Sequence, residues 1–251
     1  MNLKMLVIGI LALIGGRLPH DNQRVGIALG HVVYKIGKYD AGTQSNAPVS
    51  ADDIVSFKKI DEEMGSLAFD LFFGEHESLY ALSENAAKDN GAEFEITFAR
   101  LMAGGLCYKN NLTKEKMEQI PSFGQVFNVI KPYDEYKWEI SNETKVINGF
   151  TCYKATGVKE DHDDVRHITR TFYPVAWFTP DIPFSFGPKG LDGLPGLVLE
   201  ATFNGKLYYY AVTIDLGFNE KYVIQKPFQE RYVSEKEFYK IDAENFLRNT
   251  D

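Results

Sequence analysis

Apolar and polar residues alternate along much of the chain, which is the pattern of half-buried β-strands. The pattern is clear over residues 25–36, 66–73 and 93–101. In the second of these segments, Leu67, Phe69, Leu71 and Phe73 share one face of the predicted strand. Because the same spacing recurs further along the sequence, it predicts a protein built mainly from β-strands.

Further strands are predicted over residues 123–158, 164–178 and 197–216. Pro174 interrupts the second of these segments, because proline has no N–H to donate to a neighbouring strand. Asn148-Gly149 and Asn204-Gly205 mark tight hairpins in the other two, since both central positions of such turns favour positive φ. We interpret 123–158 as several short strands and 197–216 as the clearest hairpin of the chain.

Helices are few, and they are predicted over residues 50–66, 112–120 and 234–249. The first has a mixed pattern and is only weakly helical. The second should begin at the capping residue Thr113 and end before Pro121. The third opens with a capping box formed by Ser234 and Glu237, which is a specific sign of a helix start.

Composition supports one β domain. The chain has 251 residues, of which 44% are hydrophobic, and it contains 18 Phe and 14 Tyr, residue types that favour strands. We expect a single domain over residues 17–251 with an antiparallel curved sheet, arranged as a sandwich or a partly open barrel. The few helices, including a C-terminal one, should lie at its periphery.

Residues 1–16 have the layout of a signal peptide, with Lys4 followed by an apolar run from Met5 to Ile14. A buried N-terminal helix is the alternative. Export to the periplasm or the cell surface of a Gram-negative bacterium is therefore expected, and no second apolar run is long enough to span a membrane. The net charge of −8 argues against nucleic acid as a partner.

The two cysteines, Cys107 and Cys152, could form one disulfide after export. Buried free thiols are the alternative, because both residues lie in strand-like segments. The chain has no C-x-x-C motif, so a cysteine-based metal or redox site has no support.

The stretch FGPKGLDGLPGLVLE, residues 186–200, has glycine at every third position: Gly187, Gly190, Gly193 and Gly196. It is too short for a collagen helix, and it precedes a strand, whereas a phosphate-binding loop precedes a helix. We interpret it as a stiff turn. Gly193 and Gly196 would supply positive φ or a close backbone approach, and Pro188 and Pro195 would restrict the chain between them.

The longer segment WFTPDIPFSFGPKGLDGLPGLVLEA, residues 177–201, closely resembles the signature of the GLPGLI family. KWEISNETKVINGFTCYKATG, at 137–157, and LFFGEHESLY, at 71–80, resemble two further blocks of that family. Val198 replaces the isoleucine of the name-giving motif. The resemblance implies an exported protein of the Bacteroidota, of unknown biochemical function and without established catalytic residues.

The aromatic, proline and glycine residues of this region predict a rigid apolar surface that binds a ligand, with no cofactor. The expected ligand is an apolar small molecule, a peptide or an envelope protein, and the candidate binding residues are Trp177, Asp181, Pro183, Gly193, Leu194, Pro195, Gly196 and Glu200. Glu200 could anchor a ligand, or it could be a solvent-facing glutamate or a partner of Lys189 or Arg170. We favour the second interpretation.

Two other functions stay open. An envelope hydrolase would use Asp181, Glu200 or a histidine, and it requires two of these groups to converge in one pocket. A metal-handling protein would bring His76 or His162 close to another histidine or to several carboxylates. The sequence contains neither G-x-S-x-G nor a pair of histidines at helical spacing, so it assigns no catalytic residue and no metal ligand.

Overall fold

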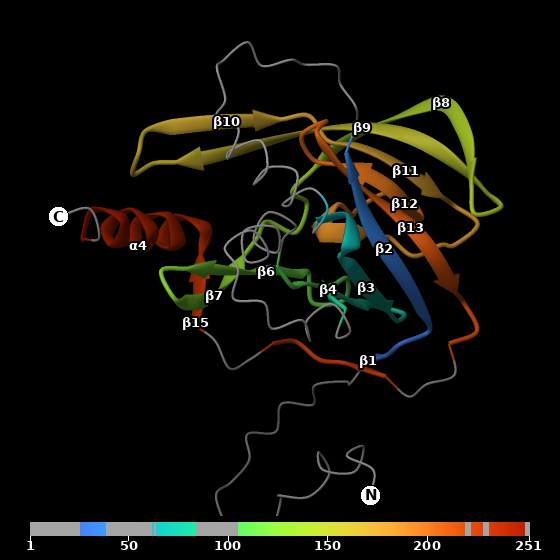
Figure 1. Ribbon diagram of the computed structural model, residues 1–251, viewed down its shortest axis with the longest axis horizontal. Coiled ribbons are helices and arrows are strands. Elements are labelled where there is room, and N and C mark those ends of the chain that lie inside the picture. Colours follow the sequence, from blue (N-terminus) through green and yellow to red (C-terminus); the bar gives the residue numbers. More distant parts are fainter. Residues whose placement is uncertain are drawn as a thin grey trace, which may run out of the picture.

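A computed structural model of the chain describes residues 26–38, 62, 64–83, 105–218, 222–227 and 231–248. The predicted signal peptide 1–16 and the predicted strand 93–101 lie outside these residues, as does most of the predicted helix 50–66. The fold is mainly β, as expected: an open sheet of 13 strands carries a 3-10 turn and a C-terminal helix (Figure 1).

The elements of the main sheet are β2 (Gly30–Lys38), β3 (Ala68–Phe73), β4 (Glu77–Leu82), β5 (Cys107–Asn110), β6 (Glu115–Ser122), β7 (Gln125–Ile130), β8 (Lys137–Ile147), β9 (Phe150–Asp163), β10 (Ile168–Phe172), β11 (Val175–Thr179), β12 (Leu197–Thr202), β13 (Leu207–Asp215) and β15 (Arg231–Ser234). A separate ribbon pairs β1 (Gly26–Ile27) with β14 (Val223–Ile224), and the two helical elements are η2 (Pro188–Gly190) and α4 (Glu235–Arg248).

The strands follow one another across the sheet in the order β9, β11, β12, β13, β2, β3, β4, β5, β6, β7 and β15. Strand β9 pairs with three strands, which are β8, β10 and β11. All pairs are antiparallel except β15 with β7, which is parallel. The antiparallel sheet expected from the sequence is thus present, with this one parallel pair at its end. No tight turn joins these two strands, which come from distant parts of the sequence, so their direction is free.

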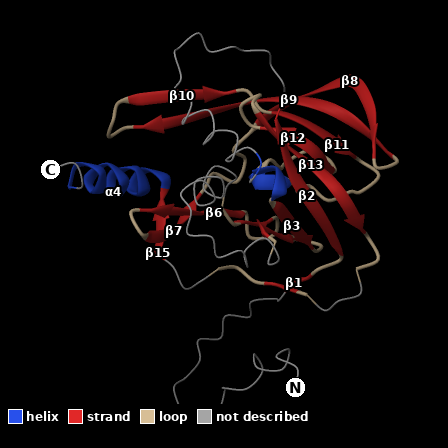
Figure 2. Ribbon diagram, in the orientation of Figure 1, coloured by secondary structure: helices blue, strands red, loops and turns tan. Residues whose placement is uncertain are grey.

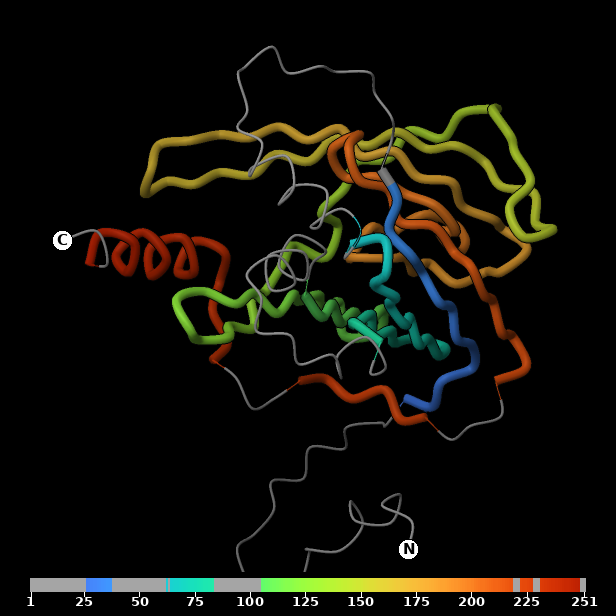
Figure 3. Tube along the Cα trace, viewed as in Figure 1, coloured from blue at the N-terminus to red at the C-terminus, as the bar shows by residue number. Residues whose placement is uncertain are grey.

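The sheet curls around η2. This short turn contacts β12 on one side and β4 and β5 on the other, although three strands separate β12 from β4 in the sheet. Figure 2 shows η2 in the middle of the molecule, surrounded by strands, and the tube in Figure 3 follows the curl. The arrangement is that of a partly open barrel, because β15 and the β8 edge do not meet.

The core lies inside this curl, and the predicted alternation is confirmed there. Leu67, Phe69, Leu71 and Phe73 are all buried, and they pack with residues of β2, β12 and β13. Aromatic rings fill much of the space, as expected for a sheet rich in Phe and Tyr.

The predicted turns are also present. Asn148 and Gly149 have φ of 49° and 85° at the tip of the β8–β9 hairpin, and Gly205 has φ of 72° between β12 and β13. The strand predicted over 164–178 divides into β10 and β11 around Pro174, as the missing donor requires.

Residues 112–114 form a turn and the following residues belong to strand β6, so the helix predicted over 112–120 is wrong. Strands β5 and β6 form a hairpin in which the Asn110 side chain accepts hydrogen bonds from the N–H groups of Leu112 and Thr113, at 2.8 and 2.9 Å. Lys114 then takes a φ of 58°, which reverses the chain. Pro121 lies beyond the last residue that pairs with β5, where β6 has one neighbouring strand, so proline is tolerated.

Helix α4 confirms the third predicted helix. The Glu237 N–H donates to Ser234 Oγ at 3.2 Å, and the Ser234 N–H donates to Glu237 Oε2 at 2.9 Å, which completes the capping box. Phe238 and Ala243 face the protein and are buried. Among the described residues, no helix combines the length and the apolar composition that crossing a bilayer requires.

Candidate functional site

The glycine-rich stretch is a packed turn that contributes to the core. Gly193 has φ of 91°, and Gly196 has φ of 157°. A Cβ added to Gly196 would lie 2.1 Å from the carbonyl oxygen of Thr179, so only glycine fits this close approach. Leu194, between the two glycines, is buried in the main cluster. The interpretation of this stretch as a stiff turn is confirmed at both positions.

Trp177 and Glu200 lie opposite each other on β11 and β12, on the outer face of the sheet. The Lys145 ammonium lies 2.6 Å from Glu200 Oε1 and 4.4 Å from the centre of the Trp177 ring. Lys145 comes from β8, and the adjacent Asn148 donates to the Ala211 carbonyl of β13 at 2.9 Å. The tip of the β8–β9 hairpin therefore bends over this face, and Lys145 is the partner that sequence reasoning did not foresee for Glu200.

The other sequence-predicted binding residues differ in exposure. Asp181, Pro183, Gly193 and Pro195 are exposed, whereas Leu194 and Gly196 are buried. The protein has one cavity beside η2 and another between α4 and the β6–β7 hairpin. None of the eight residues lines either of these two cavities. One of these cavities does reach the glycine-rich stretch, but it does so at Lys189 and Gly190, just before the GLPGLV motif.

This cavity, which we call the lysine cavity, has a volume of about 220 Å³. It lies between η2, the β5–β6 hairpin, the segment before β8 and the β9–β10 hairpin. Its lining contains four lysines, three carboxylates and several aromatic rings: Cys107, Lys116, Met117, Glu118, Lys131, Glu135, Tyr136, Lys159, Asp161, Phe172, Lys189, Gly190 and Phe203. A wall of this composition suits a ligand with a charged group and an apolar part.

Buried ion pairs tie together the elements around the lysine cavity. Lys116 Nζ lies 2.8 Å from Glu135 Oε2, 3.2 Å from Asp192 Oδ2 and 2.7 Å from the Gly190 carbonyl. Lys159 pairs with the other oxygen of Glu135, and Lys109 lies 2.6 Å from Asp192 Oδ1. These contacts join β5, β6 and β9 to the turn that follows η2.

Electrostatics keep this network ionised. Burial raises the pKa of Glu135, but the surrounding lysines, Lys116 and Lys159 above all, lower it by more, to about 2. Burial lowers the pKa of Lys116, and Asp192 and Glu135 outweigh that effect, so its pKa lies above the usual value. Nearby, Lys131 forms a similar pair with Glu235 of α4 at 2.7 Å.

Lys189 differs from the other lysines of the cavity. Within the described residues it forms no ion pair with a carboxylate, and its partner is the hydroxyl of Tyr209. Burial lowers the pKa of Lys189, but Tyr209 and Glu118 raise it further, so the amine is charged at neutral pH. The backbone at Lys189 has a positive φ of 50°.

The core also contains a hydroxyl group for which the described residues supply no partner. The Tyr80 hydroxyl is buried and makes no hydrogen bond to any residue that the structure describes. Burial raises its pKa, with further contributions from Tyr209, Cys107 and Tyr34. A buried polar group without a partner is costly, and it is found where a water molecule or ligand completes the site.

The two cysteines are free thiols, so the disulfide considered from the sequence is not formed. Cys107 lines the lysine cavity on β5, whereas Cys152 lies on β9. Burial raises the pKa of both thiols, that of Cys152 to about 11. Because the thiolate is the reactive form, neither cysteine is poised as a nucleophile.

The polar groups considered for hydrolysis or metal binding are each held by a different neighbour. His31 lies 2.8 Å from Asp70, His76 lies 3.6 Å from Glu75, and His162 lies 3.6 Å from Glu160. Within the part of the chain that the structure describes, no group of three or more His, Cys, Asp or Glu residues could hold a metal ion.

Sequence reasoning missed the lysine cavity and its ion pairs. The available signal was the phase of the strands: Lys159 and Asp161 follow Ala155 and Gly157 at alternate positions of β9. Charged residues at positions that should face the core indicate a buried polar cluster. Pairing Lys159 with Glu135, however, depends on the bend of the β8–β9 hairpin, which no local pattern encodes.

Comparisons with known proteins give little more. The model of a family described as "Protein of unknown function (Porph_ging)" matches residues 159–200, which contain the GLPGLV motif and five residues of the lysine cavity. No curated protein matches. Two structures of PNGF-II are similar in part, with 13% identity and TM-scores of 0.49 and 0.47. The matches cover 85% and 84% of this chain. They cover 33% and 32% of the PNGF-II chains, so this chain spans about a third of the length of PNGF-II.

Proposed function

We propose that the protein is an exported, non-enzymatic binding protein whose lysine cavity holds a small ligand with one anionic group and a short apolar part. The observation that supports this proposal is the charged amine of Lys189, which lines the cavity without a carboxylate partner among the described residues. The signal-like layout of residues 1–16 and the resemblance to the GLPGLI family support export.

The lining explains why the ligand should be both anionic and apolar. Lys116, Lys131 and Lys159 are each neutralised by a carboxylate, so they are not available to an incoming anion. Lys189 is therefore the natural counter-charge, and Phe172 and Phe203 supply apolar area nearby. The volume of about 220 Å³ lies below the usual range for drug-sized ligands, which favours a small carboxylate.

This proposal modifies the apolar ligand expected from the sequence. The apolar surface around Trp177 is in contact with the β8–β9 hairpin through Lys145, whereas the cavity next to the same stretch is lined by charged groups. A buried anion that meets an ammonium without a carboxylate partner gains a charge-assisted hydrogen bond, and an apolar ligand does not.

Calorimetric titration with hexanoate, hexan-1-ol and hexylamine tests the proposal. Hexanoate should bind, and the alcohol and the amine should bind at least about tenfold more weakly, because one charge-assisted hydrogen bond contributes about 1.5–3 kcal/mol. Lys189→Met should reduce hexanoate affinity by a similar factor, whereas Lys206→Met, which changes an exposed turn lysine, should not. Equal binding of the three probes, equal binding by Lys189→Met, or no binding at millimolar concentrations would contradict the proposal.

A further inference from the structure

A second cavity lies between α4 and the β6–β7 hairpin, on the other side of the lysine network. Its volume is about 450 Å³, and it is lined by Gln125, Arg231, Glu237, Lys240, Ile241, Glu244, Asn245 and Arg248. We call it the arginine cleft. A volume of this size is within the range of small-molecule sites.

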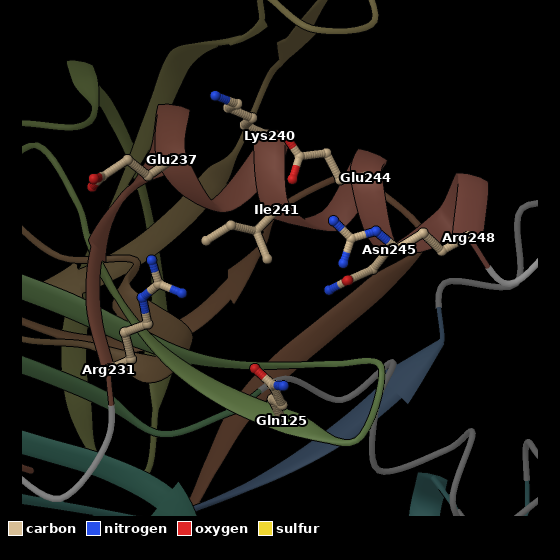
Figure 4. Close-up of a pocket in the computed structure, with 8 residues that line it drawn as sticks. All are labelled: Gln125, Arg231, Glu237, Lys240, Ile241, Glu244, Asn245 and Arg248. Carbon is tan, nitrogen blue, oxygen red and sulfur yellow. The ribbon is translucent and has the colours of Figure 1, made fainter.

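The donors of the arginine cleft face one another. In Figure 4 the side chains of Arg231, Gln125, Asn245 and Arg248 turn toward the space between α4 and β7. Lys240 and Glu244, on the same helix, line the cleft as well. Two guanidinium groups and two amides therefore border the same space, although they come from β15, β7 and α4.

Among the acidic residues of the lining, Glu237 is held mainly by Ser234, which lowers the pKa of its carboxyl, with a smaller contribution from Arg231. The Glu237 carboxylate accepts hydrogen bonds from the N–H and the hydroxyl of Ser234, at 2.9 and 3.0 Å, as part of the capping box. Within the described residues neither Arg231 nor Arg248 forms an ion pair, in contrast to Arg166, which binds Asp163 and Asp242 at 2.9 Å each. Together with Lys240, the two arginines bring three positive charges to a lining that holds two carboxylates, Glu237 and Glu244.

We infer that the arginine cleft binds a small ligand that carries a phosphate or sulfate ester. Arg231 and Arg248 hold the tetrahedral oxyanion, since the planar guanidinium donates two parallel hydrogen bonds to such groups. The Gln125 amide donates to a remaining oxygen or to a hydroxyl of the ligand. Ile241, at the floor of the cleft, contacts its apolar part.

Calorimetric titration of the full chain with glucose 6-phosphate, glucose 6-sulfate and glucose tests this inference. At least one of the two esters should bind, glucose should not, and the tighter ester identifies which group the cleft prefers. Added salt should weaken the binding, because the site is exposed and electrostatic.

Variants with the same change of charge locate the site. Arg231→Gln and Arg248→Gln should each reduce affinity about tenfold or more, as expected for the loss of a charge-assisted contact. Lys236→Gln, on the same helix but paired with Asp164, should leave it unchanged. Lys189→Met should also leave it unchanged, which separates this site from the lysine cavity. Circular dichroism checks that the variants are folded.

Three results would overturn the inference. The first is that neither ester binds at millimolar concentration, and the second is that glucose binds as well as the esters do. The third is that both arginine variants, folded, retain the affinity of the unmodified protein.

Discussion

The Lys116 ammonium lies 2.8 Å from the Glu135 carboxylate, and both side chains are about 5% exposed: 4% for Lys116 and 5% for Glu135. The same ammonium contacts Asp192 and the Gly190 carbonyl, so one buried lysine joins β6, the segment before β8 and the glycine-rich turn. Burying these charges is costly, and the network is stable because nearly every member has a partner. Removing one partner should therefore have a large effect.

Glu135→Gln should lower the free energy of unfolding at pH 7 by about 3 kcal/mol, the usual cost of breaking a buried pair. The pKa of Glu135 is about 2 in the folded protein, below its ordinary value of 4.5. Its stabilising contribution is thus complete above about pH 4.5 and is lost as the pH falls toward 2. Urea unfolding across this range should show the two proteins converging in acid.

The exposed Glu139→Gln on β8 is the matched control, and it should change the stability by less than about 0.5 kcal/mol. A difference between Glu135→Gln and the unmodified protein that stays constant from pH 7 to pH 2 would show that Glu135 is not ionised through this network.

The Lys145–Glu200 pair should contribute more than an ordinary surface pair, because Lys145 also lies over the Trp177 ring. A double-mutant cycle with Lys145→Met and Glu200→Gln should give a coupling free energy of about 1 kcal/mol. The same cycle at the more exposed Lys154–Glu143 pair should give less than about 0.5 kcal/mol. Equal coupling in the two cycles would mean that the hairpin does not hold Lys145 in place.

Gly196→Ala should destabilise the protein by about 3 kcal/mol or more, because the added methyl group would meet the Thr179 carbonyl in addition to the strain of positive φ. Gly149→Ala introduces the strain of positive φ without a steric clash, since nothing lies within 4 Å of its added Cβ. It should cost about 1 kcal/mol. Thermal unfolding compares the two. Similar losses at both positions would contradict the close approach.

Both cysteines should react slowly with a thiol reagent in the native protein and rapidly after denaturation. Burial limits the access of the reagent to each thiol. It also raises the pKa of each thiol, which lowers the fraction of reactive thiolate. In guanidinium chloride without reductant, two thiols per chain should be titrated, since neither is in a disulfide. Finding none would indicate that the cysteines pair in solution.

The sequence predicted the fold where one face of a strand is buried. Leu67 to Phe73 alternate in the expected way, and the turns at Asn148 and Gly205 lie where the Asn-Gly pairs indicate. It failed at residues 112–120, where Thr113 and Pro121 suggested helix ends. There the Asn110 side chain caps a hairpin, and pairing with both β5 and β7 overrides the local preference.

The candidate sites were less predictable than the fold. The glycine-rich stretch was interpreted correctly as a turn, but the charged residue with which it lines the lysine cavity is Lys189, which lies outside the set chosen from the sequence. Both cavities are assembled from residues far apart in the chain, such as Gln125 with Arg248 and Lys116 with Lys159. In the sequence, the charged residues of both cavities look like ordinary surface residues. Only the fold brings them together.

The pairing of β2 with β13 has a consequence for synthesis. These neighbours in the middle of the sheet come from near opposite ends of the described chain, so β2 has only one partner until β13 has been made. Until then, one edge of an apolar strand is open to other chains, which is a typical route to aggregation. Contacts of such long sequence separation also form slowly. Newly made chains should thus depend most on chaperones in the interval before β13 is released.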